Sequence, residues 1–208
     1  MILRSILTLA SFALAAPCLR ADLIVREAEI VVDVNTQSAT VNLPRFPASL
    51  GTLLLADLVL EARLNGRVEY ESTSPLGQDL VVLASRRVAL SRPNSSAPLV
   101  AEPVTRIRDL LEPFDGVVDF GGDSGRMVGG FDSTDSDLVR IDGSALAAWI
   151  GPGAVALPLQ LTDLHSVTGG GAPTTNFVTP VFVKVRVLYV YAPRSAVVRT
   201  IGTGSRTL

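Results

Sequence analysis

The sequence predicts an all-β protein, an antiparallel β-sandwich of jelly-roll-like type, preceded by an N-terminal signal peptide. Apolar and polar residues alternate with a period of two over several segments, as in strands covered on one face. Clusters of Gly, Pro, Asn and Ser separate these segments at short intervals, which favours two packed antiparallel sheets. Helical periodicity is almost absent. With 48% apolar and 18% charged residues among 208, the chain can bury a sizeable core, so wholesale disorder is excluded.

Residues 1–21 have the parts of a secretory signal. A positive start at Arg4 is followed by an apolar run over residues 6–16, and the small residue Ala21 marks the expected cleavage site to within a few residues. The run is too short to span a bilayer, which needs about 20 apolar residues. The only cysteine, Cys18, lies in this segment after a proline, so we expect neither a lipid anchor nor a disulfide in the exported chain.

Six strands are predicted in the first half of the exported chain. The clearest is 54–64, where the even positions are Leu or Ala while Asp57 and Glu61 fall between them. In chain order the six are residues 23–34, 39–43, 54–64, 68–73, 80–90 and a short piece at 99–104.

A turn is expected between the third and fourth of these strands. Asn65-Gly66 resembles a two-residue hairpin turn, but that register would place charged side chains on the apolar face. A three-residue loop over 65–67 instead keeps Leu64 opposite Val68. We predict this loop, or a crossing to the other sheet.

The second half predicts three more strands and one helical turn. Residues 116–120 form a short strand, and 144–150 form the helical turn before a Gly-Pro stop. Residues 155–161 and 181–191 alternate again, the latter with β-branched and aromatic residues on one face. The Gly-rich stretch 168–175 is expected to be a loop between strands.

Four short motifs resemble the choice-of-anchor E domain of exported bacterial proteins over roughly residues 24–192. They are Leu50-Gly51-Thr52-Leu53, Asp115-Gly116 followed by Asp119-Phe120-Gly121-Gly122-Asp123-Ser124-Gly125, Trp149-Ile150-Gly151-Pro152-Gly153, and Leu188-Tyr189-Val190-Tyr191. The resemblance implies an extracellular all-β domain without an established activity, in a family whose members end in different sorting signals. We therefore expect a signal peptide over 1–21, a sandwich domain over 22–192 and a flexible C-terminal tail over 193–208, which carries no recognisable anchor.

Two motifs resemble catalytic chemistry. Gly122-Asp123-Ser124-Gly125 has the letters of the nucleophile segment of trypsin-like proteases, but the only histidine, His165, follows the serine, whereas in that family it comes first. We interpret the segment as a Gly-rich loop joining strands. His165 lies near Asp163, yet one histidine without cysteines cannot build a zinc site, so we expect an exposed loop histidine. No catalytic residue is predicted.

The most suggestive stretch is 109–142, with nine acidic residues against two arginines. Calcium favours oxygen-rich loops, and Asp132, Asp135 and Asp137 are the candidate ligands. Their spacing is not that of an EF-hand or a Gly-rich aspartate repeat, which favours a solvated acidic loop instead. Aromatic residues make up only 5% of the chain, and Trp149 is expected to plug the core rather than stack on a sugar.

The sequence thus predicts a secreted, non-catalytic protein of the bacterial envelope or extracellular space with a structural or interaction role. Its partner is an unknown extracellular protein or polysaccharide. A calcium-assisted carbohydrate- or matrix-binding module is the alternative, and a hydrolase comes far behind. A formal charge of −2 without a basic cluster speaks against nucleic acid. We expect no cofactor other than the candidate calcium, and no membrane span once the signal is removed.

Overall fold

The computed structural model describes residues 20–171 and 173–194 and confirms the all-β prediction. The predicted signal peptide lies outside the described residues except for its last two, and so does the predicted tail beyond residue 194. The elements are β1 (Asp22–Val32), β2 (Ser38–Pro44), β3 (Gly51–Glu71), β4 (Gln78–Leu90), β5 (Leu99–Ala101), β6 (Val104–Leu111), β7 (Gly125–Ile141), the 3-10 helix η1 (Gly143–Trp149), β8 (Ala154–Asp163), β9 (Ser166–Gly169), β10 (Thr174–Val178) and β11 (Val181–Pro193).

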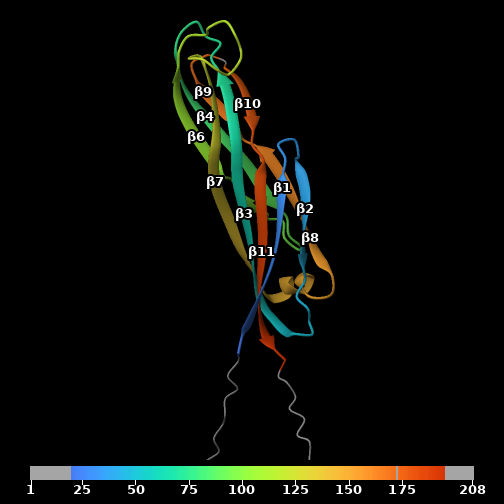
Figure 1. Cartoon of the computed structure of the whole chain (residues 1–208). Helices are drawn as coiled ribbons and strands as arrows, with labels where there is room; N and C mark the ends of the chain where they lie inside the picture. Colours follow the sequence, from blue (N-terminus) through green and yellow to red (C-terminus); the bar gives the residue numbers. More distant parts are fainter. Residues whose placement is uncertain (1–19, 172, 195–208) are drawn as a thin grey trace, which may run out of the picture.

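Two antiparallel sheets face each other in an elongated sandwich (Figure 1). One has β11 and β10 along one edge of β3, with β1 beyond β11, and β7 along the other edge. The second has β8 and β9 along one edge of β4, with β2 beyond β8, and β5 and β6 along the other edge. β1 begins and β11 ends at the same end of the molecule, while the β3–β4 and β6–β7 connections lie at the far end, the distal tip.

The central strands β3 and β4 exchange partners midway without a change of register. Leu64 pairs with Val181 in β11 and Arg67 with Val178 in β10, so only two residues, Thr179 and Pro180, interrupt the ladder. The pair Glu102-Pro103 separates β5 from β6 in the same way. Proline has no N–H to donate to a ladder, which accounts for a break at these two places. We call this level of the molecule, where the partners change, the waist.

The waist divides the interior into two cores. The larger core lies below it and includes the alternate residues of β3 from Ala56 to Leu64, each 0% exposed. Trp149 of η1 is 1% exposed in that core, which confirms its predicted role as a plug. The smaller core lies toward the distal tip and consists of Val68, Tyr70, Leu80, Val82 and Leu111. Because β3 and β4 run through both cores, the two halves share one scaffold.

The predicted loop over 65–67 and its alternative, a crossing to the other sheet, are both wrong, because β3 continues through these residues within one sheet. A Cβ on Gly66 would lie 2.1 Å from the carbonyl oxygen of Val178, so glycine allows a close backbone approach rather than a turn. The irregularity lies on the neighbouring strand, where Gly130 is an extra residue with φ of +73°. This is a β-bulge whose left-handed residue suits glycine.

Three further expectations need correction. The strand at 116–120 is absent, because Gly116 and Phe120 have φ of +100° and +57°, outside the extended region. The acidic stretch 109–142 is not one loop, since it contains the whole of β7. Residues 168–175 include the end of β9 and the start of β10. Within the described residues, no helix is long and apolar enough to cross a membrane.

Candidate functional site

The distal tip combines acidic and exposed apolar side chains. The connection between β6 and β7, residues 112–124, contains four acids and no basic residue. Apolar side chains at or beside this connection and on the neighbouring β3–β4 connection are exposed by 49–73%; they are Leu76, Leu110, Val117 and Val118. The charged and apolar groups therefore share one end of the elongated sandwich (Figure 1).

Hydrogen bonds give the tip loop a defined shape. The side chains of Asp115 and Asp119 accept from backbone N–H groups two residues ahead, at 2.9 and 2.8 Å, which forms two Asx turns. Across the loop, the N–H of Glu112 donates to the carbonyl of Asp123 at 3.0 Å. The N–H of Phe114 donates to the carbonyl of Ser74 at 2.8 Å, which joins this loop to the β3–β4 connection.

A buried pair fixes the loop to β3. The Oγ of Ser124, 1% exposed, donates to Oε1 of Glu71, 0% exposed, at 2.6 Å. The second oxygen, Oε2 of Glu71, has no hydrogen-bond partner, and a Cβ on Gly125 would lie 2.2 Å from it. The protease-like segment 122–125 therefore contains the last residues of the loop and the first residue of β7. Ser124 donates a hydrogen bond to Glu71 there, which agrees with the interpretation of this segment as a loop that joins two strands.

An open depression of about 730 Å³ lies on the tip beside this pair. Three carboxylates and one guanidinium line it, together with backbone and apolar atoms; the lining residues are Leu110, Glu112, Pro113, Asp115, Gly122, Asp123, Ser124 and Arg126. Arg126 is engaged, because it donates to the carbonyl of Gly122 at 2.9 Å and pairs with Asp109 at 3.3 Å. The free charge of the depression is thus acidic, and it suits basic groups on a partner.

Asp109 also binds the core tyrosine below the tip. The hydroxyl of Tyr70 donates to Asp109 Oδ2 at 3.0 Å. Burial, with this carboxylate as a second cause, raises the pKa of Tyr70 well above its usual range, so the phenol keeps its proton. The base of the tip is therefore held by a neutral donor and a charged acceptor.

The three calcium candidates lie in β7 and do not converge. Asp132 faces outward and binds the guanidinium of Arg63, whose hydrogen bonds lower the pKa of that carboxyl. Asp135 and Asp137 lie on the opposite face of the strand. In the described part of the chain, no group of three His, Cys, Asp or Glu side chains is placed to hold a metal ion.

Asp135 and Asp137 instead connect the two sheets. Asp137 accepts from the backbone N–H of Val100 at 2.9 Å, and Asp135 accepts from that of Glu102 at 2.7 Å. Both donors belong to β5 or the residue directly after it, so the acids satisfy the amides of an edge strand. Only Asp135-Ser136-Asp137 alternates with the period of a strand, which places both acids on one face but does not identify β5 as their donor.

His165 lies at the waist in the short connection between β8 and β9, so the prediction of a loop residue is confirmed and the prediction that it is exposed is wrong. Its side chain is 15% exposed and stacks on Phe177 with ring centres 4.3 Å apart. Its Nδ1 accepts a hydrogen bond from the backbone N–H of Ser85 in β4, at 3.2 Å. Because that N–H can only donate, the neutral ring carries its proton on Nε2, which lies 3.2 Å from Oγ1 of Thr179. His165 and Ser124 thus have different hydrogen-bond partners.

Protein stability is expected to fall as the pH drops below about 6.5, the ordinary pKa of histidine. Burial lowers the pKa of His165, against the opposing effect of Asp163, so the folded state prefers the neutral ring. The stabilisation is present above the unfolded-state pKa and is lost as the pH falls toward the folded-state pKa. Urea unfolding from pH 7 to pH 5 should show a steeper loss for the native chain than for His165→Asn, which keeps an acceptor but does not titrate. Equal slopes would contradict this role.

Comparisons with known proteins give no family. No protein-family model and no curated protein matches the chain. Among solved structures, it is similar to the structure of the infectious bursal disease virus Gx strain, with 10% identity and a TM-score of 0.18 over 89% of this chain and 42% of that one. A second is the crystal structure of the infectious bursal disease virus VP2 subviral particle, with 10% identity and a TM-score of 0.21 over the same shares. The chain therefore spans less than half the length of these two, and TM-scores this low support no functional inference.

Proposed function

We propose that this protein is an exported, non-catalytic interaction module of the bacterial envelope or extracellular space, which binds a partner through its distal tip. The observation that carries the proposal is the hydrogen-bonded loop 112–124, which groups four acids with exposed apolar residues. Clustered exposed apolar residues surrounded by polar groups are typical of interaction sites. The tip also lies opposite the end where β1 begins and β11 ends (Figure 1).

The chemistry of the tip indicates the chemistry of the partner. Glu112, Asp115 and Asp123 line the depression, and Arg126 beside them is already paired. A basic protein or basic polysaccharide with an accompanying apolar surface fits this combination. The candidate calcium ligands of β7 already bind protein donors, so the tip is the surface that we propose for binding.

Binding to basic polymers tests the proposal. Poly-L-lysine and chitosan are immobilised, with neutral dextran as the blank. The variant Asp115→Asn/Asp119→Asn/Asp123→Asn keeps the side-chain oxygens that form the Asx turns but removes three charges. We expect its binding to be roughly tenfold weaker, equivalent to about 1.4 kcal/mol.

The matched control removes three charges elsewhere, with Asp33→Asn/Glu102→Gln/Asp142→Asn. This variant has the same net charge as the tip variant, so it should bind nearly as the native chain does. An equal loss in both variants would show a general effect of net charge and would contradict the proposal. Absence of binding by the native chain would contradict it as well.

A further inference from the structure

The outer edge of β1 has no partner strand. β1 pairs with β11 over all eleven of its residues, and no strand of the described chain pairs with its other side. An edge of this length offers a row of backbone N–H and C=O groups to an additional strand. β2, the neighbouring edge of the second sheet, has exposed Ser38, Thr40, Asn42 and Pro44, which are typical of a protected edge.

β1 also carries incompletely buried apolar side chains on both faces, on either side of its central charged residues. On the outer face Leu23, Val25 and Val31 are exposed by 56, 47 and 58%. The inward-facing Ile24 and Ile30 are only half-buried, whereas their partners in β11 on the same face are almost fully buried. The edge therefore leaves apolar surface in water on both sides of the sheet.

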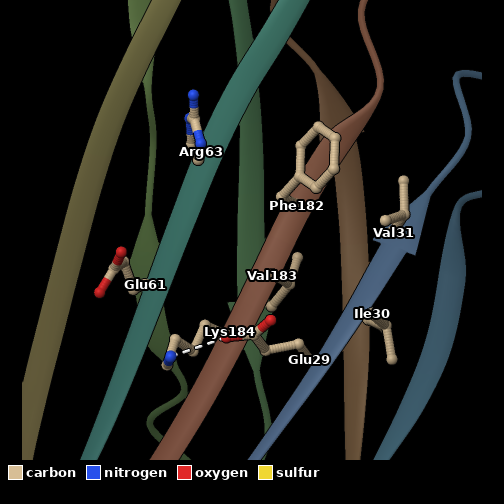
Figure 2. A pocket seen from close by; sticks show the side chains of 8 residues that line it. All are labelled: Glu29, Ile30, Val31, Glu61, Arg63, Phe182, Val183 and Lys184. Atoms are coloured by element: carbon tan, nitrogen blue, oxygen red, sulfur yellow. Dashed lines mark ion pairs between the residues drawn. The ribbon is translucent and has the colours of Figure 1, made fainter.

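A shallow depression of about 340 Å³ lies where β1 approaches its end (Figure 2). Val31 and Phe182 are register partners across β1 and β11, and Phe182 is 43% exposed. On the neighbouring pair, Nζ of Lys184 lies 2.7 Å from Oε1 of Glu29. The depression thus has an apolar end beside Val31 and a charged end beside Glu29.

We propose that β1 is a self-association edge, on which two copies of this chain pair β1 to β1 in antiparallel fashion about a two-fold axis at Glu27. The apolar residues at both ends of the strand match in this register, whereas Val25 of each copy faces Glu29 of the other. Leu23 of one copy faces Val31 of the other, Ile24 faces Ile30, and the long Arg26 faces the small Ala28. A two-fold interface requires that the same patch fits itself, and the two copies would extend their sheets into one.

The charges at the centre of the pairing oppose it in part, and Lys184 of each copy reduces this opposition. Glu27 would face Glu27 of the second copy, an unfavourable pair by itself. Each copy brings its own cation, because Nζ of Lys184 lies 3.4 Å from Glu27 as well as beside Glu29. Leu23 of the second copy would lie next to Val31 and cover the apolar end of the depression at Phe182. The matching apolar ends of the two strands thus favour a second copy, while Lys184 offsets part of the repulsion at the centre.

Sedimentation across a protein concentration series tests the pairing and its register. The native chain should form dimers at high concentration. Leu23→Lys/Val31→Lys places like charges opposite each other twice, and we expect loss of the dimer. Leu23→Lys/Val31→Glu places Lys opposite Glu at both sites and should restore it. Leu138→Lys, on the outer face of β7 and 59% exposed, is the control that should leave the dimer intact.

Both substituted positions are exposed in the single chain, so the unfolding temperature of dilute protein should not change among the variants. A native chain that stays monomeric at every concentration overturns the proposal. So does a dimer that persists in the double-lysine variant, or one that the Lys/Glu variant fails to restore. A dimer that Leu138→Lys disrupts would place the interface on the other edge of the sheet and would equally overturn it.

Discussion

Replacing Arg86 with methionine is expected to lower the free energy of unfolding by about 3 kcal/mol. Arg86 is a charged side chain of β4 that is only 1% exposed. Its guanidinium donates to the carbonyl oxygens of Asp33, Val34 and Thr36 at 2.9, 3.1 and 2.5 Å, and its Nε lies 2.9 Å from Asp163. Methionine fills similar space but leaves these acceptors without their donor.

Urea unfolding of Arg86→Met measures this loss, and the neighbouring exposed Arg87 supplies the control. Arg87→Met should change the free energy of unfolding by no more than about 0.5 kcal/mol, as surface substitutions usually do. Arg86→Lys should recover only part of the loss, because one ammonium cannot reproduce the planar fork that spans several carbonyls. A loss in Arg86→Met no larger than that in Arg87→Met would contradict the assignment.

Replacing Ser124 with alanine is expected to destabilise the chain by about 2 kcal/mol, with the effect concentrated at the tip. The substitution removes the hydroxyl that donates to the fully buried Glu71 at 2.6 Å. A buried carboxylate without a donor is costly, and the loop can relieve this cost by opening. Amide exchange at Ser72 and Glu112, whose N–H groups bond to Ser124 and Asp123, should therefore accelerate.

The matched variants separate this effect from a general loss. Ser96 is an exposed serine of the β4–β5 connection, so Ser96→Ala should leave the free energy of unfolding and the amide exchange at the tip unchanged. Adding Glu71→Met to Ser124→Ala removes the buried carboxylate and should restore part of the stability. Unchanged exchange at Ser72 in Ser124→Ala would show that the buried pair does not hold the loop.

Where one face of a strand meets one core, the sequence predicted the structure well. The period of two identifies β11 and the 54–64 part of β3, and the alternate residues of both are buried. Trp149 was assigned to the core for a similar local reason, a large apolar side chain before a Gly-Pro stop. At these positions burial determines which residues are apolar, and in a strand it produces an alternation that can be read from the sequence.

The remainder depends on contacts between residues far apart in the chain. Asn65-Gly66 has local turn chemistry, but the approach of Val178 decides its conformation. The local sequence predicts that Asp135 is an acid of a solvated loop, but it accepts a hydrogen bond from the backbone N–H of Glu102, directly after β5. The local sequence around His165 predicts an exposed side chain, but Phe177 and Thr179 contact its ring at the waist. In each case the partner lies more than ten residues away, so a local pattern carries no sign of it.

The common position of the two ends of the fold has a mechanical consequence. Asp22 at the start of β1 lies opposite Tyr191 near the end of β11 (Figure 1). Tension applied at these ends peels the two strands apart one hydrogen bond at a time, which needs little force. Tension between these ends and the tip is expected to pass from β11 to β3 through their long ladder and to load many of its hydrogen bonds together in shear. The molecule is thus built to yield when stretched by its ends and to resist when pulled lengthwise.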